Sequence, residues 1–156
     1  MLPLRRNYRY YFKYSLFVKT CSLAMFSVIS FGIYYLLSEQ SLLYRSIGVL
    51  LIFLLFSSIA IAPIYFEEWN DRYVLRLALM KRVYDKSVYT ATLFDSDQLT
   101  KSIRIFASGG FFGFTGIFWN NKLGFFQCYI SNLKSHFVHI RKRNKEKGGI
   151  LINIDV

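Results

Sequence analysis

The chain has 156 residues, of which 54% are hydrophobic and 19% aromatic, and its formal net charge is +11 at pH 7. This composition is unusually apolar for a soluble domain, and the two cysteines, Cys21 and Cys128, do not indicate a disulfide framework or an oxidising compartment. A basic chain can bind nucleic acid or anionic lipid. Because the sequence has no basic recognition helix and no RNA-binding signature, we do not expect nucleic acid as a partner.

Residues 1–15 are basic and aromatic. They predict a juxtamembrane segment in which cations contact anionic headgroups and tyrosines lie at the membrane interface. The same cations also fit a simple topology signal, and the two interpretations are compatible. The residues of this segment that we assign to headgroups are Arg5, Arg6 and Arg9.

Two long apolar runs follow and are the strongest signal in the sequence. They cover about 18–38 and about 46–66, and no charged residue lies between Arg45 and Glu67. At about 1.5 Å per helical residue, each run approaches the roughly 30 Å hydrocarbon thickness of a bilayer. The short connection forces the two helices to be antiparallel, so residues 16–66 predict a transmembrane helical hairpin.

The flanking charges predict the orientation of this hairpin. Lysines and arginines are abundant before the first run and after the second, whereas the connecting loop contains only Arg45. The positive-inside rule therefore predicts a multi-pass protein of the cell (cytoplasmic) membrane with both termini in the cytoplasm. The absence of ionisable residues between the flanking charges argues against a transporter. Pro63 is expected to end or kink the second helix.

Residues 67–156 predict a domain of short strands. From Arg72 the apolar residues alternate with a period of two up to Met80, which indicates one half-buried strand. Turn-forming residues, such as those at 85–87 and 145–149, separate the later strands. Further strand-like runs lie at 88–94, 103–106, 125–130, 136–141 and 150–154. With no clear soluble helix, this pattern predicts an antiparallel β-barrel or sandwich, and the fold class is membrane α+β.

The most distinctive motif is the glycine- and phenylalanine-rich stretch 108–116. Its glycines permit positive φ angles, and its phenylalanines place a large apolar surface in a predicted loop. Two interpretations stay open: the aromatic rings pack in the core of the domain, or Phe111, Phe112 and Phe114 contact the membrane, the ends of the helices or a partner. A phosphate site is not indicated, because no helix opens after the glycines.

A basic run lies at a predicted hairpin tip. It is either a solvated turn or a contact site for anionic headgroups or an acidic partner. Its members are Arg141, Lys142, Arg143, Lys145 and Lys147.

The sequence contains no recognisable catalytic or metal-binding constellation. His136 and His139 are three apart on a predicted strand and therefore point to opposite faces. No Ser or Cys nucleophile stands in a known motif beside a base. We therefore expect a protein that is not an enzyme and has no cofactor and no metal.

The stretch 102–116 resembles the bacterial pleckstrin-homology (PH)-like membrane proteins, in which a basic, hydrophobic strand runs into a Ser-Gly-Gly-Phe-Phe-Gly-aromatic loop. Asn121–Gly124 and the isoleucine-rich last strand also match, and the resemblance covers about 64–154. It implies a strongly bent β-structure of about seven strands. The family pattern continues into a helix that caps one end of the barrel, whereas this sequence ends at Val156. Either the opening is uncovered, another element such as a transmembrane helix end or the N-terminal segment covers it, or the strand assignment is wrong.

Together these features predict an integral membrane protein that displays a cytoplasmic PH-like β-domain for interaction with a protein or peptide. The partner is a different protein or a further copy in a homo-oligomer, and membrane lipids surround the helices. The alternative is a module that senses anionic lipids through the basic hairpin.

Overall fold

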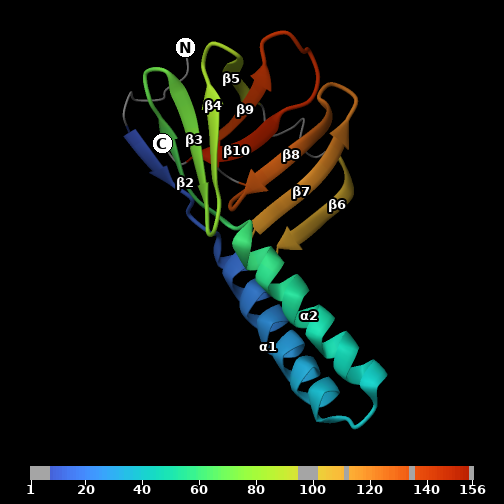
Figure 1. The fold of residues 1–156 in the computed structure, drawn as a ribbon. Coiled ribbons are helices and arrows are strands. Elements are labelled where there is room, and N and C mark those ends of the chain that lie inside the picture. Colours follow the sequence, from blue (N-terminus) through green and yellow to red (C-terminus); the bar gives the residue numbers. More distant parts are fainter. Residues whose placement is uncertain (1–7, 95–101, 111–112, 134–135, 155–156) are drawn as a thin grey trace.

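The computed structural model describes residues 8–94, 102–110, 113–133 and 136–154 (Figure 1). Two long helices lie side by side and project from a β-domain, and the chain enters and leaves the helices at the same end of that domain. In this part of the chain the domain contains ten strands in two sheets.

The two helices are α1 (Leu16–Ser38) and α2 (Leu42–Ala60). At about 1.5 Å per residue they are about 35 and about 28 Å long, comparable with the hydrocarbon core of a bilayer. Their apolar side chains are mostly exposed, since the β-domain contacts them only near one end. The prediction of two apolar helices of membrane-spanning length is confirmed. The second one ends at Ala60 rather than near 66, because Pro63 begins a strand.

The first sheet contains four antiparallel strands in the order β1-β2-β3-β4. β1 pairs with β2 from Tyr8↔Glu68 to Tyr11↔Tyr65, so part of the segment predicted as a headgroup anchor is a strand of the β-domain. The helical hairpin is therefore an insertion between two neighbouring strands. The bounds are β1 Tyr8–Tyr11, β2 Pro63–Glu68, β3 Arg72–Leu77 and β4 Lys81–Asp85.

The second sheet contains six strands in the order β5-β9-β10-β8-β7-β6. Its neighbours are antiparallel except for β10 and β8, which are parallel. The bounds are β5 Tyr89–Phe94, β6 Ile103–Gly110, β7 Gly113–Asn120, β8 Gly124–Ile130, β9 His136–Lys142 and β10 Ile150–Ile154.

The β-domain thus differs from the predicted antiparallel barrel or sandwich of about seven strands. It has two sheets, one of them mixed, and the sheets do not form a closed barrel. Strands outside the predicted runs explain the higher count. β1 and β2 lie on either side of the helices in the sequence, and β4 follows the strand predicted up to Met80, which corresponds to β3 and a turn that lacks glycine, proline and asparagine. The prediction of a loop over 108–116 is wrong, because the described residues of this stretch belong to the end of β6 and the start of β7.

Two apolar clusters hold the domain together. The first joins the two sheets and includes Phe66, Leu75, Tyr129 and Ile152. The second lies on the opposite face of the six-stranded sheet, because successive side chains of a strand point to opposite faces. In β8, for example, Phe126, Cys128 and Ile130 belong to the second cluster, whereas Tyr129 belongs to the first.

Candidate functional site

The start of α1 is fastened to the end of the β-domain that faces the helices. The Ser15 backbone N–H donates to the Ser131 carbonyl at 3.3 Å, and the Ser15 hydroxyl accepts from the Val18 N–H as the helix N-cap. Ser131 is fixed in turn, since its N–H donates to the Asn153 side-chain oxygen at 2.8 Å. A chain of hydrogen bonds therefore connects the first turn of α1 with β10.

Val18 adds an apolar contact to this connection. Its side chain is fully buried and belongs to the second cluster, together with Phe114, Ile130, Phe137 and Leu151. The first turn of α1 thus covers part of the six-stranded sheet. It also places Phe114, one of the three predicted contact residues, in the core beside the start of a helix.

The end of α2 is capped by the β3–β4 turn. The last carbonyls of a helix lack intrahelical partners, and here the Leu79 N–H donates to the Ala60 carbonyl at 3.2 Å. The Ala78 N–H likewise donates to the Ala62 carbonyl at 2.8 Å. This arrangement places Leu79 next to the helix end although the side chain is 74% exposed. The turn is therefore an apolar tip at the helix end of the domain, and the sequence pattern did not predict it.

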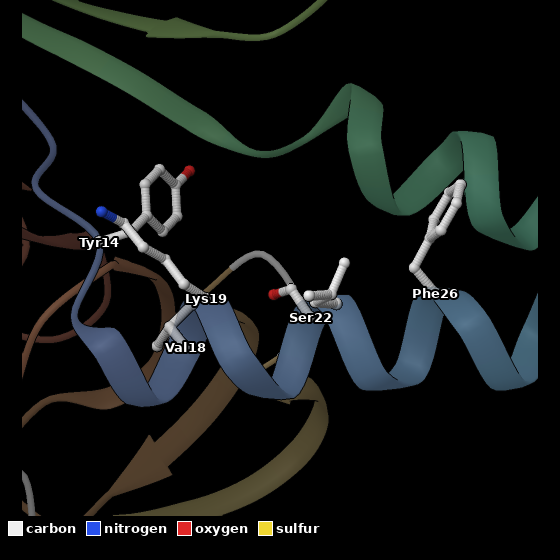
Figure 2. Close-up of a pocket in the computed structure, with 6 residues that line it drawn as sticks. Tyr14, Val18, Lys19, Ser22 and Phe26 are labelled. Carbon is white, nitrogen blue, oxygen red and sulfur yellow. The ribbon is translucent and has the colours of Figure 1, made fainter.

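A groove opens beside α1 at this junction (Figure 2). Its volume is about 440 Å³, and it is lined by Tyr14, Val18, Lys19, Ser22, Leu23 and Phe26. The Tyr14 hydroxyl donates to the Pro63 carbonyl at 2.7 Å, so this ring also bridges the two ends of the helical insertion. Burial raises the pKa of Tyr14 to about 12, and the hydroxyl therefore stays protonated at neutral pH.

A second apolar surface lies along three neighbouring strands at one edge of the six-stranded sheet. The register places Ile103, Trp119 and Phe125 opposite one another across β6, β7 and β8, and Phe106 opposite Ile117. We call these five residues the β6 patch. Its most exposed members are Phe106 (81%) and Phe125 (63%). Among the described strands β6 pairs only with β7, so the patch reaches a sheet edge.

The basic hairpin lies between β9 and β10, at the end of the domain opposite the helices (Figure 1). Two of its cations form hydrogen bonds with backbone carbonyls of nearby turns: Arg141 donates to the Glu146 carbonyl at 3.0 Å, and Arg143 donates to the Lys86 carbonyl at 3.1 Å. Lys142, Lys145 and Lys147 belong to the same hairpin. A membrane crossed by α1 and α2 would therefore lie at the opposite end of the domain from these cations.

His139 organises the interior of this hairpin. Its Nε2 lies 2.9 Å from the Gly148 carbonyl, which only accepts hydrogen bonds, so Nε2 carries the proton. Burial lowers the pKa of the imidazole and thereby favours its neutral form. His136 is exposed on the other face of the strand, as the spacing of the two histidines predicted.

Of the predicted N-terminal cations, Arg9 is already engaged within the domain. It forms an ion pair with Glu67 on β2, and its guanidinium lies 4.5 Å from the centre of the Tyr65 ring. Burial alone would raise the pKa of Glu67, but hydrogen bonds from Trp69 and Arg9 and the charges of Arg9 and Lys81 outweigh it and lower that pKa. Arg5, Arg6, Phe111 and Phe112 lie outside the described residues.

The described residues present few reactive groups. Burial raises the pKa of Cys128, so its thiol stays protonated. Within the ranges that the structure covers, no group of three or more His, Cys, Asp or Glu side chains is placed to hold a metal ion. The features that stand out are surfaces: the helices, the junction groove and the β6 patch.

Fold and surfaces together define an architectural class, in which two exposed apolar helices of membrane-spanning length are inserted into a two-sheet β-domain. Comparison of the chain with models of known protein families, with curated proteins and with solved structures finds no match.

Proposed function

We propose that α1 and α2 anchor the protein in a membrane, and that the β-domain, held at the membrane surface, binds an extended segment of a partner protein along β6. The observation that supports docking is the β6 patch, a contiguous apolar surface that reaches a sheet edge on which the described residues place no further strand. The protein acts in this proposal as a non-catalytic interaction module.

Membrane anchoring is supported by the environment of the helices. Side chains such as Phe31, Leu42 and Phe53 are exposed, and the β-domain is too far from most of the helix length to cover them. Helices that are apolar on all sides are stable only inside protein or in lipid. A lipid bilayer is therefore the environment that explains the exposed apolar side chains of both helices.

The orientation in this proposal follows the distribution of cations. Lys13 and Lys19 precede or begin α1, and Arg72 and Arg76 follow α2, whereas Arg45 is near the opposite end of the hairpin beside Glu39. The positive-inside rule then favours a cytoplasmic β-domain, with both termini on that side.

Two physical arguments favour a partner strand on β6. An open edge presents unpaired backbone N–H and C=O groups, and natural proteins usually protect such edges with charges, bulges or prolines. β6 has one bulge, between Arg104 and Phe106, but it also exposes the large side chains of Ile103, Ile105 and Phe106. Covering one such side chain contributes about 1.5–3 kcal/mol. A pairing strand would thus gain hydrogen bonds and apolar contact together.

The test is site-specific photo-crosslinking in intact membranes. A benzoylphenylalanine at position 106 of the full chain is expected to give one discrete adduct, and adding Phe125→Arg should remove it. The matched control is the same probe at Val83, which is 50% exposed on β4, an edge strand of the other sheet. That position should give no such adduct.

Equal adducts from positions 106 and 83, or an adduct that survives Phe125→Arg, would contradict docking at the β6 patch. An adduct between two copies of the chain would identify the occupant as a second protomer. The mass of the adduct therefore separates a homo-oligomer from a different partner.

The alternative function, lipid sensing by the basic hairpin, has less support because that hairpin is remote from the helices. The likeness to bacterial PH-like proteins stays a prediction about the β-domain. The proposed docking on β6 does not depend on it.

A further inference from the structure

The groove beside α1 is lined almost entirely by apolar surface, and Lys19 is the one cationic residue among those that line it. Its lining comes from the segment just before α1 and from the first three turns of the helix, where Lys19, Ser22, Leu23 and Phe26 follow one another at helical spacing. Figure 2 shows Lys19 extending alongside the Tyr14 ring, toward the β-domain, while Phe26 points toward α2. The cationic end is thus near the domain and the apolar end is further along the helix.

Lys19 is also the one charged residue within α1. Near the end of a membrane-spanning helix, the long stem of a lysine allows its ammonium to reach the interface. Among the described residues, Lys19 belongs to no salt bridge. Its charge is therefore available to a ligand that lies in the groove.

We infer that this groove binds one anionic phospholipid of the leaflet next to the β-domain. The phosphate lies against the Lys19 ammonium beside Tyr14, and one acyl chain runs along Leu23 and Phe26. The volume of about 440 Å³ lies within the range of about 300–1,000 Å³ that is typical of ligand sites. The inference rests on the membrane anchoring proposed above and is independent of docking at the β6 patch.

Charge and apolar surface together distinguish a phospholipid from other ligands. A soluble phosphate would meet the ammonium but leave the apolar part of the groove empty. A zwitterionic lipid would fill the groove and offer a phosphate, but its own quaternary ammonium would oppose the charge of Lys19. An anionic lipid offers the negative charge without this opposing cation, in the order in which the membrane presents the two features: charge at the surface and hydrocarbon further in.

The test uses the purified full chain in detergent with phosphatidylglycerol and phosphatidylcholine of identical acyl chains, observed by native mass spectrometry. We expect one phosphatidylglycerol to be retained per chain, with a preference over phosphatidylcholine of about fivefold, the ratio expected for one lysine at an anionic surface. Lys19→Gln should abolish the preference. Arg45→Gln, which removes the one charge of α2, should leave it unchanged.

A second variant tests the groove itself. Leu23→Trp fills the apolar part and should reduce retention of both lipids, while circular dichroism verifies that the helices are intact. Glycerol phosphate should not displace the bound lipid. The inference would be overturned if the preference for phosphatidylglycerol were equal in the wild type and in Lys19→Gln, or if Arg45→Gln lost that preference to the same extent as Lys19→Gln. Displacement of the bound lipid by glycerol phosphate would also overturn it. Membrane extraction of the same variants reports separately whether anchoring holds.

Discussion

Both ends of the β-domain carry cations, but the two ends differ in almost every other respect. At the helix end, Lys13 and Lys19 lie at the start of α1, and Leu79 and most apolar side chains of both helices are exposed. At the opposite end, the cations of the basic hairpin surround a tight turn held by backbone carbonyls. From the sequence, both the basic N-terminal segment and the basic hairpin are candidates for contact with anionic headgroups.

This difference shows that a cluster of cations is not by itself a membrane contact. A surface that binds a bilayer combines charge with apolar side chains at the same place. The helix end has this combination, whereas the distal hairpin is organised by its own hydrogen bonds.

The largest expected effect concerns the backbone of the distal hairpin. Gly149 has φ +116°, and a Cβ there would collide with the Ile140 carbonyl oxygen and approach His139 Nε2 to 2.9 Å. Gly149→Ala should therefore cost more than about 3 kcal/mol of unfolding free energy, the upper range for a strained residue. Thermal unfolding of the full chain in detergent measures this loss.

Gly148→Ala is the matched control. Gly148 also has a positive φ, +89°, but an added Cβ would meet the Phe125 carbonyl only at an ordinary 3.5 Å. Its cost should be about 1 kcal/mol. Equal losses in the two variants would show that the hairpin is not packed as described.

A smaller effect is expected at the helix end. Val18→Ala removes two methyl groups from a fully buried site between α1 and the sheet, which should cost about 2 kcal/mol. Val28→Ala makes the same change on an exposed part of α1 and should cost less than about 0.5 kcal/mol. Chemical denaturation of the β-domain compares the two, and similar midpoints would mean that α1 does not stabilise the sheet.

The smallest effect is a pH dependence of the distal end. Because burial lowers the pKa of His139 in the folded chain, the unfolded chain takes up a proton first as the pH falls below the ordinary value of 6.5. Stability should be complete above that pH and decrease below it, by at most about 1.4 kcal/mol per pH unit. His139→Phe should remove this slope between about pH 7 and about pH 5, above the range in which carboxylates titrate. If the pH dependence of stability were unchanged in His139→Phe, it would arise from another titratable group.

The helices could be predicted because their signal is local. Composition and length suffice for α1 and α2, and Pro63 marks the limit of the second helix. The turn at 85–87 and the opposite faces of the two histidines also follow from local rules.

The features that the sequence did not predict depend on contacts between residues that are distant in the chain. β1 is recognisable only through its pairing with β2, which lies beyond the whole helical insertion. The β3–β4 turn has no turn-forming residues, because hydrogen bonds to the end of α2 stabilise it instead. The β6 patch requires the register of three strands, since Phe106 and Phe125 are not related by any sequence period.

The position of the bilayer relative to the two ends of the domain can be measured directly. In a Cys21→Ser/Cys128→Ala background, a fluorophore is attached through Leu79→Cys or Lys145→Cys, and the full chain is placed in nanodiscs whose headgroups carry a nitroxide quencher. The account predicts strong quenching at position 79 and none at position 145. Equal quenching at the two positions, or stronger quenching at 145, would contradict a membrane at the helix end of the domain.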